Sequence, residues 1–158
     1  MKIGVVLRDV YWSETDLADD LLRLADRHRA DHDVFHVARD VAVWSRRHAQ
    51  DVAAIAPDYG AEVDGRPGSP AGSAAPEARR GPLAGTDDPS LVLLRDLRGV
   101  YLAATGVAAD WQMLAQAAQG VRHAELLDLA ERCRAETQRQ ARWANGKLKE
   151  SATQALVS

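Results

Sequence analysis

The sequence predicts an all-α protein, a four-helix bundle in which a long crossover loop joins two antiparallel helical hairpins. Apolar residues recur at spacings of three and four in two stretches of the chain, which is typical of amphipathic helices. No stretch shows the period of two that a half-buried strand requires. All six prolines lie within residues 57–89, so the stretches on either side contain no proline to interrupt a helix.

The first hairpin is predicted to contain helices at 5–30 and 33–56. Either Asp31 or Asp33 can cap the second of them, because a carboxylate accepts hydrogen bonds from free backbone amides. So short a break favours an antiparallel hairpin. The expected buried stripes consist of Val10, Leu17, Leu21 and Leu24 in the first helix and of Val34, Val37, Val41, Trp44, Val52 and Ile55 in the second.

The helices of the second hairpin are predicted at 89–119 and 123–145. Asp88 before Pro89 is a favoured helix start, with a capping carboxylate followed by a residue that needs no amide partner. An Asn-Gly pair is expected to end the last helix and to leave a C-terminal tail at 146–158. The expected buried stripes consist of Leu97, Val100, Val107, Trp111 and Leu114, followed by Leu126, Leu129, Cys133 and Leu148.

The segment 57–88 between the hairpins is rich in Pro, Gly, Ala and Ser, which favours an irregular, flexible crossover loop. A helix of about 24 residues is about 36 Å long, and a connection of this size can pass along that whole length. The third helix would then start at the far end of the bundle, unlike in an up-and-down bundle with short loops. The whole chain, 1–158, is predicted to form this single domain.

Composition excludes several classes of protein. The chain has 158 residues, is 46% hydrophobic and carries a net charge of −3, as expected for one folded domain. Cys133 is the only cysteine, which excludes a disulfide framework and a zinc site built from cysteines. No apolar run approaches the ~18 residues of a membrane span, and no basic run is long enough for nucleic-acid binding. We expect a cytoplasmic protein.

The two hairpins resemble each other in sequence, which indicates an internal duplication. A shift of 90 positions aligns the first helix of each hairpin, and a shift of 92 aligns the second. Chance matching between Ala-rich helices is the alternative explanation. Over the sixteen positions 10–25, the identical pairs at the first shift are Val10 and Val100, Tyr11 and Tyr101, Thr15 and Thr105, Ala18 and Ala108, Asp20 and Asp110, Leu24 and Leu114, and Ala25 and Ala115.

Two related helical hairpins joined by a long crossover resemble the ferritin-like superfamily, in particular its small bacterial members related to rubrerythrin. The resemblance covers 5–56 and 89–145. It implies that each hairpin supplies an inward Glu from its first helix and a Glu-x-x-His motif from its second, which together bind two iron ions. No Glu-x-x-His motif occurs in this sequence. The resemblance therefore implies a degenerate di-iron site.

Few of the ligands that the resemblance implies are present. Glu14 lies on the inward stripe of the first helix, whereas its repeat partner is Ala104, and Glu136 is one residue out of register. The segments that stand in place of the two motifs are Ser45-x-x-His48 and Thr137-x-x-Gln140. If a metal binds, its expected ligands are Glu14, His48 and Glu136. The polar residues expected in the core are Tyr11, Tyr101, Ser45, Thr137 and Gln140.

Glu14 and His48 are the sharpest pair of candidate functional residues. Across a turn centred near Asp31, positions 14 and 48 are level with each other, so the two side chains can touch. One interpretation is a remnant metal site or an acid–base pair, with Glu136 on a neighbouring helix. The other is a hydrogen-bonded polar pair that fixes the register of the bundle and performs no chemistry.

The sequence thus predicts a ferritin-like bundle that has lost its di-iron site and acts as a non-catalytic binding or assembly module, without a cofactor. Its partners would be further copies of the chain, bound through helix faces, or another protein, and neither nucleic acid nor membrane is expected. The alternative is an iron- or manganese-dependent redox or iron-binding protein that uses the reduced ligand set in the bundle core.

Four other reactive side chains are expected to be structural. His28, His32 and His36 are spaced by four, but the spacing crosses the predicted turn, so we expect them to be solvated. Cys133 lies on the core stripe of the last helix and is expected to be inert, because the sequence shows no neighbour that would stabilise a thiolate.

Overall fold

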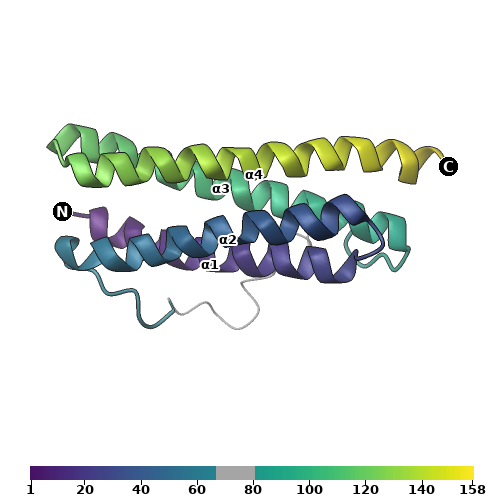
Figure 1. Cartoon of the computed structure of the whole chain (residues 1–158), viewed down its shortest axis with the longest axis horizontal. Helices are drawn as coiled ribbons and strands as arrows, with labels where there is room; N and C mark the ends of the chain where they lie inside the picture. Colours follow the sequence, from purple (N-terminus) through teal and green to yellow (C-terminus); the bar gives the residue numbers. More distant parts are fainter. Residues whose placement is uncertain (67–80) are drawn as a thin grey trace.

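The computed structural model describes residues 1–66 and 81–158, so part of the predicted flexible loop 57–88 lies outside the described residues. Helices are the only regular secondary structure in this described part, which confirms the all-α class and the four helices (Figure 1). The helices are α1 (Ile3–Arg27), α2 (His32–Ile55), α3 (Pro89–Val121) and α4 (Ala124–Val157), with a short 3-10 helix η1 (Ala56–Tyr59) after α2. None of the helices described here is long and apolar enough to cross a lipid bilayer.

The helices α2 and α3 each begin at an aspartate whose carboxylate caps the helix, as the sequence predicts. The side chain of Asp31 accepts a hydrogen bond of 3.0 Å from the backbone amide of Val34 at the start of α2. Asp88 accepts from the amides of Ser90 and Leu91 at 3.0 and 3.4 Å at the start of α3. These bonds satisfy amides that have no partner within the helix, and they fix where α2 and α3 begin.

The last helix is longer than predicted. It continues through Gly146 to the end of the chain, so the expected stop and the tail at 146–158 are wrong. A glycine inside a helix costs about 1 kcal/mol relative to alanine, but packing offsets this cost here. Lys147 and Ser151 are both buried and extend the inward face of α4 beyond the glycine.

Lys147 ties this extension of α4 to the start of α2. Its ammonium nitrogen lies 3.5 Å from the carboxylates of Asp31, Asp33 and Glu150. Burial alone lowers the pKa of Lys147, but the three negative charges outweigh burial and raise it. The lysine therefore stays charged, and its contacts favour continuation of the helix over a stop at the preceding glycine.

The helices form two pairs, α1 with α2 and α3 with α4, which pack against each other (Figure 1). Between the pairs, α1 contacts α3 and α2 contacts α4. Arg27 at the end of α1 binds Asp96 near the start of α3, whereas Glu14 meets Trp111 further along. These two contacts show that α1 and α3 run in opposite directions.

The described part of the crossover follows α1. Just after η1, the side chain of Ala61 packs beside Gly4, where a larger residue would collide with the backbone of Tyr59. Further on, the Arg8 guanidinium donates to the carbonyl of Gly65 at 2.8 Å. The chain thus leaves the first pair beside the start of α1, and α3 begins beside the end of α1.

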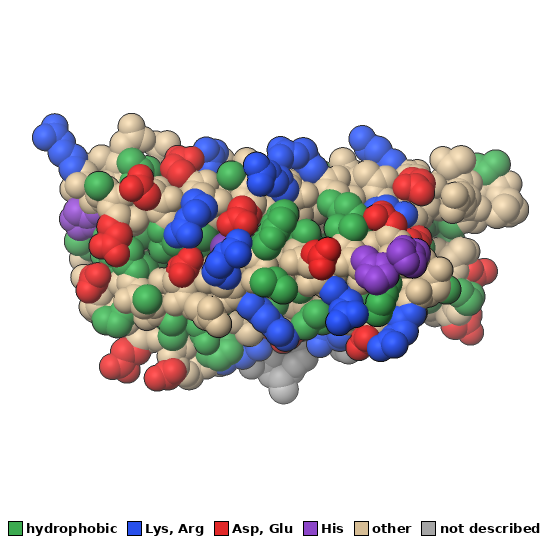
Figure 2. Space-filling model, in the orientation of Figure 1, with side chains coloured by type: hydrophobic (Ala, Val, Ile, Leu, Met, Phe, Trp, Pro, Cys, Tyr) green, Lys and Arg blue, Asp and Glu red, His purple; other side chains and the backbone are tan. Residues whose placement is uncertain are grey.

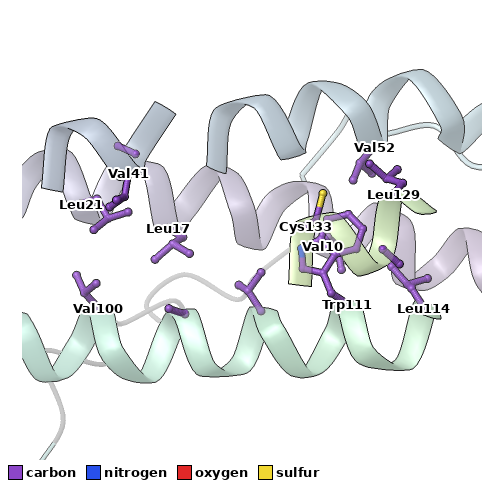
Figure 3. Close-up of a cluster of buried hydrophobic side chains, with 14 of the residues drawn as sticks. Val10, Leu17, Leu21, Val41, Val52, Val100, Trp111, Leu114, Leu129 and Cys133 are labelled. Atoms are coloured by element: carbon purple, nitrogen blue, oxygen red, sulfur yellow. The ribbon is translucent and has the colours of Figure 1, made fainter. Parts of the chain in front are cut away.

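The core lies along the bundle axis between the two pairs (Figure 3). Trp111 of α3 is its largest fully buried side chain and packs next to Val10 and Cys133. Trp44 and Val37, expected on the buried stripe of α2, are only half-buried. Leu148, expected on the stripe of α4, is half-buried as well, and the other apolar residues expected on the stripes are buried.

Candidate functional site

The middle of the bundle contains a cluster of polar side chains to which every helix contributes. We call it the central cluster, and its residues are Glu14 from α1, His48 from α2, Trp111 from α3, and Cys133 and Glu136 from α4. Each lies on or next to the inward stripe of its helix, where the spacings of three and four place successive side chains on one face. The cluster is therefore a property of the bundle and of no single motif.

His48 is at the centre of this cluster. Its Nδ1 atom contacts Oε2 of Glu14, and its Nε2 atom lies 3.2 Å from Oε1 of Glu136. The indole N–H of Trp111 donates to the same Oε2 of Glu14 at 3.1 Å. Glu14 is 0% and His48 1% exposed, so water does not weaken these contacts.

The arrangement favours the protonated form of His48. An ionised carboxylate only accepts hydrogen bonds, so an imidazole that faces a carboxylate oxygen at each nitrogen must donate from both. Burial alone lowers the pKa of His48, but its interactions with Cys133 and with the negative Glu14 raise that pKa to about 10. The core thus holds a Glu14–His48 ion pair at neutral pH.

The cluster reaches the surface on one side and ends in an unpaired oxygen on the other. Glu136 is 17% exposed and also accepts from the Arg47 guanidinium at 2.8 Å, which balances the charge toward solvent. On the inner side, the Oε1 atom of Glu14 is buried without a hydrogen-bond partner among the described residues. This oxygen is the only part of the carboxylate that remains available to a ligand.

Cys133 is closer to a charged group than the sequence indicates. His48 interacts with the thiol and by itself lowers the thiol pKa, but burial has the larger effect and raises it. Cys133 is therefore a neutral thiol, as expected for an inert core cysteine. Sequence reasoning missed this contact because it joins residues 85 positions apart on different helices.

Apart from His48, the residues in place of the two motifs are buried and bond the protein backbone or each other. Gln140 donates through Nε2 to the carbonyl of Val41 at 2.8 Å and to the hydroxyl of Ser45 at 2.9 Å. Thr137 donates to the carbonyl of Cys133 at 2.7 Å. The two bonds of Gln140 connect α4 to α2 beside the central cluster, whereas the bond of Thr137 stays within α4.

The two tyrosines of the repeat lie outside the central cluster. Tyr11 and Tyr101 are half-buried and take no part in its hydrogen bonds, so the expectation that they belong to the core is only half right. In both places a threonine one turn later, Thr15 or Thr105, donates its hydroxyl to the tyrosine carbonyl at 2.8 Å. The equivalent positions thus have equivalent local structure.

The donor set of the central cluster does not fit a pair of metal ions. A histidine coordinates a metal only through a nitrogen lone pair, and His48 has both nitrogens engaged as donors. The two carboxylates are each paired with a cation or with the indole. Among residues 1–66 and 81–158, no group of three or more His, Cys, Asp or Glu side chains is arranged to hold a metal ion.

A second polar cluster, which the sequence did not reveal, joins α1 to α3. Asp96 is buried and accepts hydrogen bonds from Arg27, His28 and Arg95. Burial alone raises the pKa of Asp96, but the bond from His28 and the charges of both arginines outweigh it and hold this pKa below its usual value. His28 was expected in solvent, but it lies at 2.8 Å from this carboxylate with 10% of its side chain exposed.

No family model, no curated protein and no solved structure matches this chain. The geometry described above therefore supplies the argument for its function.

Proposed function

We propose that the chain is a ferritin-like helical bundle that has lost the di-iron site and acts as a non-catalytic binding or assembly module. The observation that carries this proposal is that both ring nitrogens of His48 are engaged in hydrogen bonds to carboxylates of the same chain. His48 lies in the segment that replaces one Glu-x-x-His motif. A histidine that donates from both nitrogens holds helices together and has no lone pair for a metal.

The path of the chain supports the ferritin-like arrangement. The first pair of helices ends beside Gly4 at the start of α1, and the second begins near Asp96, which binds Arg27 at the end of α1. The crossover must therefore pass along the length of the bundle. This connectivity distinguishes ferritin-like bundles from bundles with three short loops.

The surface between α3 and α4 supports a binding role. A groove of about 390 Å³ lies between these helices, and the small side chains of Ala108, Ala109 and Ala141 are among those that line it. Small residues permit the close approach of another helix, so this face suits self-association or a protein partner. Exposed Met113, on the same helix, adds apolar surface.

Metal quantification tests the loss of the di-iron site. Protein without an affinity tag is purified from cells grown with added iron and manganese, with no chelator, and its metals are measured by elemental analysis. We expect well under one iron or manganese ion per chain. Two ions per chain would refute the proposal.

Sedimentation at several concentrations tests assembly. If the chain is a monomer at every concentration, it does not self-associate, and the proposed binding role would then require a different protein as the partner.

One observation favours the alternative, an iron- or manganese-binding protein that uses Glu14, His48 and Glu136. The Oε1 atom of Glu14 is buried with no partner among the described residues, and such an oxygen is a possible ligand. This alternative predicts that His48→Ala abolishes metal content while circular dichroism shows that the helices stay folded. Unchanged metal content in that variant would eliminate it.

A further inference from the structure

Two histidines outside the central cluster lie together on the surface of α2. This helix begins at His32, so His32 and His36 are one turn apart on the same face. Both side chains are exposed, and their ring centroids are only 4.3 Å apart. Figure 2 shows two histidine side chains in contact on the surface of the bundle. The turn that was expected to separate the three histidines removes only His28 from the group.

We propose that His32 and His36 form a surface chelate for one divalent late transition-metal ion, of the class Cu²⁺, Ni²⁺ or Zn²⁺. Imidazole nitrogen is a favoured ligand for these ions and a poor one for Mg²⁺ or Ca²⁺. Two histidines at positions i and i+4 of a helix can reach the same ion, as in helical zinc motifs. The helix holds the two rings near each other before the metal arrives, which lowers the entropic cost of binding.

The charges around the pair are compatible with a bound cation. Asp40, one turn after His36, is exposed and has no ion-pair partner among the described residues. The guanidinium groups of Arg29 and Arg39 lie over the ring of Phe35, at 5.4 and 4.9 Å from its centroid. The arginines are thus held against an aromatic ring, and one free carboxylate lies on the same face of α2 as the pair.

This site is independent of the function proposed above. His48 lies on the same helix but is buried, and its nitrogens are engaged inside the bundle. The surface pair supplies only two protein ligands, so solvent or a further molecule must complete the coordination of the ion. We therefore expect an exchangeable site and not a structural one.

Equilibrium titration with NiCl₂ and with ZnCl₂ on protein without an affinity tag tests the proposal. One ion should bind per chain, and MgCl₂ should not compete. His36→Gln should weaken Ni²⁺ binding by about a hundredfold. In the wild type, an ion bound to one imidazole has the second imidazole held nearby at a high effective concentration, and the variant lacks this second ligand. His123→Gln should leave Ni²⁺ binding at the surface unchanged, because His123 precedes α4 at the opposite end of the bundle.

A matched control keeps the number of histidines constant. In His36→Gln/Arg39→His, the two surface histidines are seven positions apart, about 10 Å along the helix, and cannot chelate one ion. This variant should bind Ni²⁺ as weakly as His36→Gln alone. Both changes are at exposed positions, and circular dichroism verifies the fold. Wild-type affinity in either variant, or loss of binding in His123→Gln, would overturn the proposal.

Discussion

Glu14 and His48 stabilise the bundle only as a pair. Replacing His48 by Leu would leave the Glu14 carboxylate buried beside the indole N–H alone. We expect this change to lower the free energy of unfolding by about 3–5 kcal/mol, the typical cost of an unpaired buried charge. Urea denaturation followed by circular dichroism measures the difference.

The double variant Glu14→Gln/His48→Leu is the control for this prediction. Glutamine removes the charge but keeps an oxygen that can accept from Trp111, so the core no longer contains an uncompensated ion. The double variant should be more stable than His48→Leu alone. If it is less stable, the two side chains contribute independently and do not form an ion pair.

The raised pKa of His48 makes stability depend on pH. The pKa is 6.5 for an ordinary histidine and about 10 here, so between these values the folded protein keeps a proton that the unfolded chain releases. The stabilisation is complete below about pH 6.5 and is lost as the pH rises toward about 10. We expect the free energy of unfolding to fall between about pH 7 and pH 9, by at most about 1.4 kcal/mol per pH unit.

Urea denaturation of the wild type and of His48→Leu across this pH range measures the effect. The variant should lack the decline, because it has no imidazole at this position. Parallel curves for the two proteins would show that another group causes the dependence, and would contradict a buried imidazolium.

The sequence predicts some residues of the central cluster and not others. Glu14 and His48 interrupt otherwise apolar stripes, so periodicity alone places them inside the bundle. Cys133 and Trp111 lie on the same stripes, but apolar periodicity cannot say which stripe residues meet across the bundle. Asp96 carries no such signal, because its role depends on two arginines and a histidine that the fold brings to it.

Helix boundaries follow the local signals except where tertiary packing opposes them. The capping carboxylates Asp31 and Asp88 act within one turn of their own positions, so the starts of α2 and α3 can be predicted from the sequence. Gly146 is also a local signal, for a helix end, but α4 continues through it. The contacts of Lys147 with the first pair of helices decide this, and no local pattern encodes them.

Gly146→Ala tests the continuity of α4. The glycine lies within the helix, and an added Cβ meets no atom within 4 Å. Alanine should therefore raise the free energy of unfolding by about 0.5–1 kcal/mol, since it restricts the unfolded chain without strain in the folded one. Thermal denaturation measures this as a higher melting temperature.

Gly60→Ala provides the opposite case. Gly60 ends η1 with a φ of 69°, a conformation that costs an alanine about 1–2 kcal/mol. This variant should melt at a lower temperature than the wild type. A loss of stability in Gly146→Ala as well would indicate that the glycine ends α4 in a left-handed conformation, as the sequence pattern suggested.

The two pairs of helices share one core, and their equivalent positions have similar surroundings. Val10 and Val100 are both buried, and burial raises the pKa of both Asp20 and Asp110. These similarities support the interpretation that one hairpin was duplicated. The polar contacts of the central cluster are not repeated, because Glu14 has Ala104 as its repeat partner. Each pair therefore needs the other to complete the central cluster.

Two fragments, 1–66 and 81–158, test this dependence. Alone, each would expose the apolar face that the other covers, such as Leu17 and Leu21 on α1 or Trp111 on α3 (Figure 3). A hairpin without that cover loses most of the burial that stabilises its helices, so each fragment should be largely unfolded or self-associated. Mixed in equal amounts, they should form a complex of one copy each, with circular dichroism near that of the intact chain. Fragments that are separately monomeric and melt cooperatively would show that each hairpin is an independent domain.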